Sequence, residues 1–101
     1  MAMPDPEARL ATRTAKAVVV ELSAMHWPLG QVQATTQNVS ARGARVITRR
    51  RWYPGDRVGL SSLEEDVSTQ GRVVYCVRTA KGGFAIGLEL LAPVDKWAEP
   101  Q

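Results

Sequence analysis

The chain has 101 residues, a formal net charge of +3 and 45% apolar residues, which is typical of one globular domain and excludes an intrinsically disordered chain. The one cysteine, Cys76, excludes an intrachain disulfide, and with the one histidine, His26, it supplies too few ligands for a Cys/His zinc cluster. No apolar run approaches the ~20 residues that span a bilayer, and the N-terminus lacks the apolar core of a signal peptide. We therefore expect a cytoplasmic protein without a membrane span.

Short β-type segments follow one another along the chain, separated by turn residues. Residues 1–8 contain two prolines and are expected to be disordered, and the stretch that follows, up to Lys16, is expected to be an arm or loop. Strands are predicted where β-branched residues cluster or polar and apolar residues alternate, at residues 17–22, 31–37, 43–49, 57–62, 71–78 and 84–90. Six short strands without a long helix indicate an all-β protein, either a small antiparallel barrel or a sandwich.

The segments between these strands are predicted to be turns and loops. Turn residues cluster at 38–43, 53–56 and 81–83, and residues 63–70 are expected to form an acidic, solvated loop. In the fifth strand, Val73, Tyr75 and Val77 are expected to share one face, and Cys76 to be a small, buried or half-buried apolar residue. Residues 98–101 end a short C-terminal tail.

No enzymatic motif is present. The chain has no serine-centred nucleophile elbow and no glycine-rich phosphate loop ending in Lys-Ser or Lys-Thr. Glu64, Glu65 and Asp66 are consecutive, without the ligand spacing of an EF-hand, so we expect no metal there. These observations predict a binding protein rather than an enzyme.

The basic residues are mostly arginine, ten of thirteen, and six of the ten lie between Arg42 and Arg57. Arginine binds phosphate through its planar fork and stacks on aromatic rings. Residues 49–53, Arg-Arg-Arg-Trp-Tyr, would suit single-stranded nucleic acid as one alternative. Another alternative is a protein-interaction barrel with an exposed aromatic patch, made of Trp27, Trp52, Tyr53 and Trp97.

The most distinctive group of residues joins the second and third predicted strands. Asn38, Ser40, Arg42 and Gly43 place an amide, a hydroxyl, a guanidinium and bare backbone in one turn, in which glycine is expected to supply an unusual φ. Upstream, Arg9 and Arg13 stand four residues apart on the predicted arm. Two guanidinium groups on a mobile segment can fold over an anionic ligand.

These two groups, Arg9-x-x-x-Arg13 and Asn38-x-Ser40-x-x-Gly43, resemble the RxxxR and (D/N)xSxxG motifs of the PilZ domain family. Residues 53–58, Tyr-Pro-Gly-Asp-Arg-Val, are similar to the family's PGD turn, and residues 71–75 and 84–91 are similar to its last two strands. The resemblance covers residues 9–97, which we take as the domain.

The resemblance implies a six-stranded antiparallel split barrel that binds cyclic di-GMP and signals by docking to a protein partner. Arg9 and Arg13 would hold phosphate and the guanine O6 and N7 atoms, and Asn38, Ser40 and Gly43 would contact base and ribose-phosphate. We add Arg42 and Arg45 to the ligand-binding set because of their charge and proximity. No further cofactor, and no nucleic acid, is expected. The chain lacks a second arginine beside the first motif arginine and has only a short tail where the family has a C-terminal helix, so a divergent barrel that does not bind nucleotide is the alternative.

Overall fold

The computed structural model describes residues 14–25 and 30–98, and the chain there forms strands and one short 3-10 helix. The strands are β1 (Thr14–Ala15), β2 (Val19–Ala24), β3 (Gln31–Ser40), β4 (Gly43–Thr48), β5 (Arg57–Ser62), β6 (Val67–Thr79) and β7 (Gly83–Leu90), and the 3-10 helix is η1 (Asp95–Trp97). This confirms the predicted all-β class.

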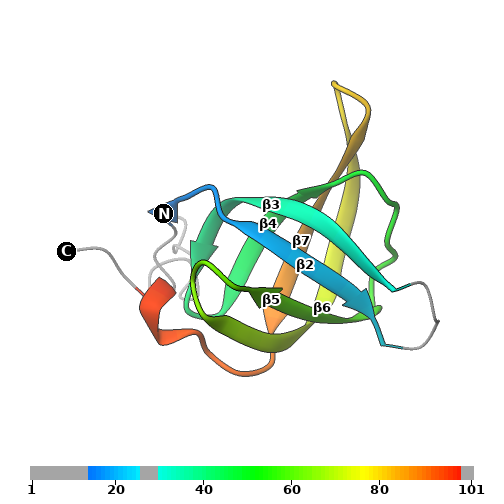
Figure 1. Ribbon diagram of the computed structural model, residues 1–101. Coiled ribbons are helices and arrows are strands. Elements are labelled where there is room, and N and C mark those ends of the chain that lie inside the picture. The colour runs from blue at the N-terminus through cyan, green and yellow to red at the C-terminus, as the bar shows by residue number, and fades with distance from the viewer. Residues whose placement is uncertain (1–13, 26–29, 99–101) are drawn as a thin grey trace, which may run out of the picture.

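The strands form a closed antiparallel barrel (Figure 1). Hydrogen-bonded neighbours follow the order β3, β2, β5, β6, β7 and β4, and β4 pairs back with β3. The additional strand β1 pairs with the end of β3, beyond the stretch that β2 occupies on the same edge. Closure leaves six strands with partners on both sides and confirms the barrel.

Alternation along each strand builds the barrel interior. In β2, Leu22 and Val20 are buried whereas Val19 and Glu21 are exposed, so this strand is half-buried and not fully buried as its apolar sequence suggested. The core continues through strands β3 to β7, with Ala34, Val46, Leu60, Val73, Ile86, Leu88 and Leu90 among its members. The alternating apolar residues of the strand predicted at 84–90 are thus confirmed as core from Ile86 onward.

Two strand boundaries and one bulge account for the main differences from the sequence-based predictions. Strand β3 runs through Ser40, so that Asn38 lies in a strand and the turn is shorter than expected. Strand β6 begins at Val67, which leaves only residues 63–66 as the acidic turn. A bulge between Val73 and Tyr75 inserts an extra residue, so Val73 faces the core while Tyr75 does not, and the three residues predicted to share a face are divided.

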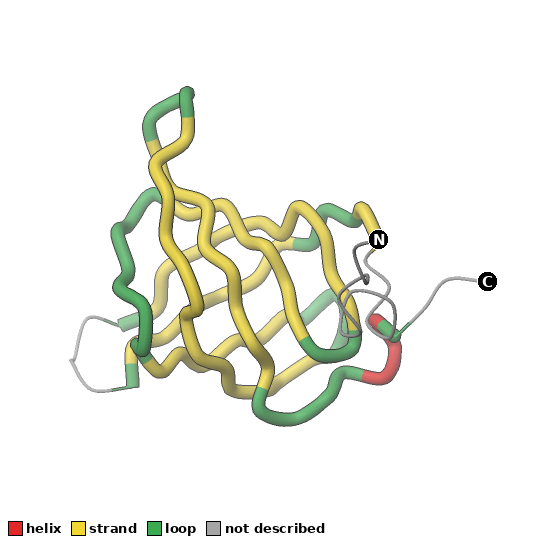
Figure 2. Tube along the Cα trace, turned by 180° about the vertical axis from the view of Figure 1, so that it is seen from behind, coloured by secondary structure: helices red, strands yellow, loops and turns green. Residues whose placement is uncertain are grey.

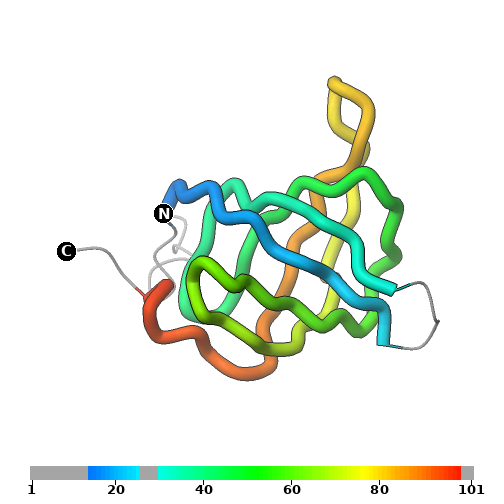
Figure 3. The backbone as a smooth tube through the Cα atoms, in the orientation of Figure 1, coloured from blue at the N-terminus to red at the C-terminus, as the bar shows by residue number. Residues whose placement is uncertain are grey.

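Two tryptophans from loops at opposite ends of the barrel join the core. Trp52 lies in the β4–β5 loop and Trp97 in η1, and both side chains are buried. The end that carries Trp52 also carries the β6–β7 hairpin, which projects beyond the barrel in Figures 2 and 3. The end that carries Trp97 also carries β1 and the β3–β4 turn. Each tryptophan therefore helps to close one end of the barrel.

Within residues 14–25 and 30–98, no helix has the length and apolar character needed to cross a membrane.

Candidate functional site

Hydrogen bonds within the strand pair and from residues 90 and 94 fix the β3–β4 turn. Ser40 and Gly43 form the last pair of the two strands, and the Ser40 hydroxyl donates to the Gly43 carbonyl at 3.3 Å. The carbonyls of the two turn residues also accept hydrogen bonds, Ala41 from the Val94 amide at 2.8 Å and Arg42 from the Leu90 amide at 2.9 Å. The backbone of the turn is therefore fixed, whereas the Arg42 side chain is exposed.

Predicted site residues share the outer face of the β3–β4 pair. Val39 and Ala44 belong to the core, so their neighbours Asn38 and Arg45 point outward and are half-buried, whereas Ser40 and Gly43 are buried. A bulge lies between Thr36 and Asn38, and there two β3 residues, Gln37 and Asn38, oppose Arg45. The structure thus brings Asn38, Ser40, Arg42, Gly43 and Arg45 to one corner.

Arg45 is held in place by its neighbours. Its Nε donates to the Gln37 side-chain oxygen at 2.7 Å, and its Nη1 donates to the Tyr75 hydroxyl at 2.8 Å. The guanidinium carbon lies 5.7 Å from the centre of the Tyr75 ring. That ring covers Gly87, which pairs with both Arg45 and Tyr75. Sequence reasoning missed Gln37 and Tyr75, because the bulges that bring them to Arg45 leave no simple periodic signal.

Strand β1 brings the start of the described chain to the same corner. Thr14 pairs with Val39, and Ala15 pairs with Asn38. Just after it, the Lys16 amide donates to the Gln37 carbonyl at 3.2 Å. Part of the segment predicted to be an arm or loop is therefore a strand. Arg9 and Arg13, both predicted ligand-binding residues, lie outside the described residues.

Gly43 does not have the conformation expected of it. Among the described glycines, positive φ occurs at Gly30, Gly55 and Gly82. Gly43 instead continues β4, opposite Ser40 on one side and Glu89 on the other. Gly43 is buried in this pairing, so the position shows neither the unusual φ nor the bare, accessible backbone that the sequence suggested.

The predicted aromatic patch does not form. Trp52 and Trp97 are buried, whereas Tyr53 is 58% exposed, and Trp27 lies outside the described residues together with His26. Burial of Trp52 also removes a stacking ring from the nucleic-acid surface expected at residues 49–53. Cys76 is half-buried and packs against the core, as predicted.

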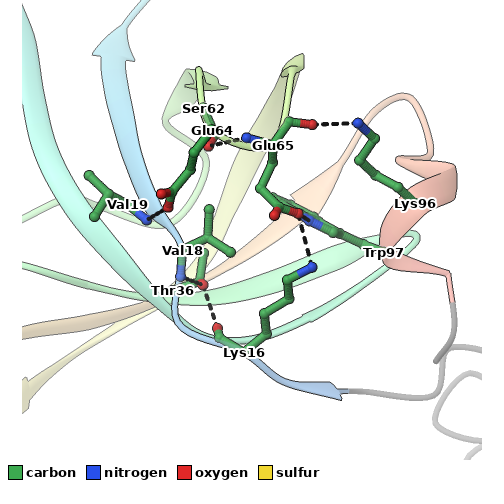
Figure 4. Close-up of polar contacts among 9 residues, drawn as sticks. All are labelled: Lys16, Val18, Val19, Thr36, Ser62, Glu64, Glu65, Lys96 and Trp97. Carbon is green, nitrogen blue, oxygen red and sulfur yellow. Dashed lines mark hydrogen bonds and ion pairs between the residues drawn. The ribbon is translucent and has the colours of Figure 1, made fainter.

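The acidic turn is more than a solvated loop. The Glu65 carboxylate accepts hydrogen bonds from Lys16 Nζ at 2.9 Å and from Trp97 Nε1 at 3.0 Å (Figure 4). Lys96 donates to the Glu65 backbone carbonyl, and the Glu64 carboxylate accepts from the Val19 amide at 3.1 Å. The hydrogen bonds from Lys16 and Trp97 hold the pKa of Glu65 below its usual value.

No group of histidine, cysteine and carboxylate side chains that could hold a metal ion occurs within the described part of the chain. The carboxylates of Glu64 and Glu65 accept hydrogen bonds from a backbone amide and from Lys16. The corner around Asn38 contains amide and guanidinium groups, which suit an anionic ligand with polar edges. The Ser40 side chain is buried there, and its hydroxyl donates to the Gly43 carbonyl.

Comparison with known proteins agrees with this architecture. A model of the PilZ domain matches residues 7–96. The structure of the inhibitor of motility (MotI/DgrA) from Bacillus subtilis superimposes with a TM-score of 0.70 at 19% identity, over 93% of this chain and 50% of that one. This chain therefore spans half the length of that protein, and a search of curated proteins gave no match. With the matched region covering most of its residues, the chain belongs to the PilZ domain family.

Proposed function

We propose that this chain is a receptor for cyclic di-GMP, in which the ligand is held between the segment that carries Arg9 and Arg13 and the corner formed by β3 and β4. The observation that supports it most directly is the pairing of Thr14 with Val39 and of Ala15 with Asn38. Arg13 immediately precedes Thr14 in the chain. Since consecutive Cα atoms are about 3.8 Å apart, the segment must leave β1 beside the Asn38 and Ser40 motif.

The corner supplies complementary chemistry. Arg42 is exposed at a turn whose backbone is anchored on both carbonyls, so its charge reaches solvent without a mobile backbone. Asn38 is half-buried beside this turn, whereas Gly43 is buried. A bis-phosphate ligand would meet the guanidinium groups of Arg9, Arg13 and Arg42 and the side chain of Asn38. Arg45 would act at the edge, because Gln37 and Tyr75 already orient it.

The output would be a protein contact and not a reaction. PilZ domains act as binding modules, and the structurally similar MotI/DgrA is an inhibitor of motility. We propose that cyclic di-GMP orders the arginine segment on the barrel and so changes the surface that a partner meets.

Calorimetric titration with cyclic di-GMP, with GTP as the control ligand, tests the proposal. We expect the double variant Arg9→Ala/Arg13→Ala to weaken binding by about two orders of magnitude or more, since each charged hydrogen bond contributes about 1.5–3 kcal/mol. A matched control, Arg49→Ala/Arg78→Ala, removes two arginines at the other end of the barrel and should retain wild-type affinity.

Two outcomes would contradict this assignment. Equal affinity in the wild type and in Arg9→Ala/Arg13→Ala would remove the arginine segment from the site. A wild-type chain that binds no cyclic di-GMP at millimolar concentration would instead be the divergent, nucleotide-free barrel.

A further inference from the structure

The carboxylates are unevenly distributed between the two ends of the barrel, whereas basic residues lie at both. The end with the β6–β7 hairpin carries basic residues of the β4–β5 loop and of the hairpin, namely Arg49, Arg50, Arg51, Arg78 and Lys81. Glu64, Glu65, Asp66, Glu89 and Asp95 lie toward the opposite end, which also carries Lys16, Arg42, Arg45 and Lys96. Asp56 is the carboxylate of the β4–β5 loop, and it accepts a hydrogen bond from the Tyr53 amide at 2.9 Å.

A pocket of about 330 Å³ opens at the basic end, between the ends of β3 and β4 and the β6–β7 hairpin. Its lining includes Arg49 and Lys81, the hydroxyl-bearing residues Thr35, Thr48 and Thr79, and Gly83, and it includes no carboxylate. Arg49 and Lys81 are both exposed and approach the pocket from different elements. Cations and hydroxyl donors in a site without carboxylates are the groups that recognise an anion.

The hairpin is shaped to frame this pocket. Gly82 has φ of 86°, and its amide donates to the Thr79 carbonyl at 3.2 Å, which closes the turn. A Cβ at Gly83 would lie 3.1 Å from the Thr48 carbonyl oxygen, so glycine allows the hairpin to lie close against the end of β4. The hairpin thus brings Lys81 to the same pocket as Arg49.

Arginines on aromatic rings extend the basic surface beside the pocket. The Arg51 guanidinium carbon lies 5.3 Å from the centre of the Phe84 ring and 5.9 Å from that of Tyr53, and Arg78 lies 5.8 Å from Phe84. These rings hold the arginines at fixed places and leave the guanidinium N–H groups available to an acidic partner.

From this geometry we propose that the pocket and the adjoining arginines are a docking site for an acidic segment of a partner protein, with an aspartate or glutamate side chain bound between Arg49 and Lys81. The pocket, at about 330 Å³, has the volume for one or a few side chains. Trp52 is buried, and the Phe84 and Tyr53 rings already contact arginine, so stacking surface for nucleic-acid bases is limited. The docking site is separate from the nucleotide corner, since Gly43 and Thr48 stand at opposite ends of β4.

Fluorescence anisotropy with a labelled hexaglutamate peptide tests the proposal on the full chain. We expect saturable binding that weakens as salt is raised, and a loss of affinity of about tenfold or more in Arg49→Gln/Lys81→Gln. The matched control is Lys16→Gln/Lys96→Gln, which removes the same charge at the opposite end, beside Glu65, and should bind the peptide as the wild type does.

Three results would overturn the docking site. Equal loss in the two double variants would show that only net charge matters. A labelled oligothymidylate that binds more tightly than the peptide, through Arg49 and Lys81, would assign the surface to nucleic acid. Concentration-dependent self-association abolished by Arg49→Gln/Lys81→Gln would assign it to a second copy of this chain.

The docking site and the nucleotide site can be tested independently, because each double variant should lose one ligand and keep the other. Arg49→Gln/Lys81→Gln should keep nucleotide affinity, whereas Arg9→Ala/Arg13→Ala should keep peptide affinity. If Arg49→Gln/Lys81→Gln loses both ligands, its thermal unfolding transition shows whether it is folded. If it is not folded, the single variants Arg49→Gln and Lys81→Gln are tested in its place.

Discussion

Tyr75, Gly87 and Arg45 form a three-residue unit on the outside of the barrel. The tyrosine ring lies over the glycine, and its hydroxyl accepts a hydrogen bond from Arg45. An aromatic ring over a strand glycine restores the packing that the missing side chain would have provided. From its charge, Arg45 was predicted to bind the ligand. The sequence did not predict the bulge before Tyr75, which brings the tyrosine hydroxyl to Arg45 as a structural partner.

Gly87→Ala tests this unit. A Cβ at position 87 would overlap the Tyr75 ring, so the ring must leave and its hydrogen bond with Arg45 is lost. We expect a loss of about 1–3 kcal/mol in the free energy of unfolding, as for other overpacked sites. Urea denaturation of both chains measures it.

Gly59→Ala is the matched control, because a Cβ there would meet Ser23 Cβ at 3.7 Å, an ordinary contact. Its free energy of unfolding should stay within about 0.5 kcal/mol of wild type. In a Tyr75→Ala background the cost of Gly87→Ala should largely vanish. An undiminished cost in that background would show that the glycine is needed for a reason other than the ring.

The turn between β5 and β6 makes contacts with distant elements that strand prediction from local sequence does not detect. Periodicity located most strands, yet it assigned residues 63–70 to a solvated loop, whereas β6 already begins at Val67. Glu65 bonds Lys16, 49 residues away, and Trp97, 32 residues away. Contacts over such separations depend on barrel closure, which local sequence patterns do not encode. The turn therefore ties the segment after β1 to η1.

Glu65→Gln should destabilise the chain in a pH-dependent way. The folded state lowers the pKa of Glu65, so the stabilisation is present above the unfolded pKa, about 4.3, and is lost as the pH falls through the folded value. We expect a difference of about 1 kcal/mol between wild type and variant at pH 7. Urea denaturation across pH 2–7 should show the difference shrinking in the acid range.

Lys16→Gln provides the second half of this test. It removes the cation from the same ion pair, so the double variant with Glu65→Gln should cost less than the sum of the single variants. Strict additivity of the two costs, or a wild-type advantage that persists unchanged at pH 2, would contradict the role given to this ion pair.

For the whole molecule, composition and periodicity predicted the class, the number of barrel strands and much of the core. Alternating residues such as Ile86, Leu88 and Leu90 carry that information directly. The two buried tryptophans and the clustering of carboxylates toward one barrel end could not be predicted, because they depend on which loops meet at each end. Of the candidate site, Asn38, Ser40, Arg42, Gly43 and Arg45 lie at one corner, and their contact with a ligand stays a prediction.

The proposed ligand bridges the amino-terminal segment and a closed barrel, so it should stabilise the native state as a whole. A ligand that binds only the folded chain contributes about 2.7 kcal/mol at one hundred times its Kd. In a domain of this size that corresponds to a rise in Tm of roughly 10 °C or more. Differential scanning calorimetry with cyclic di-GMP should show this rise in wild type and in Arg49→Gln/Lys81→Gln, and none in Arg9→Ala/Arg13→Ala. An equal rise in the last variant would mean that the barrel corner binds the nucleotide without the two arginines.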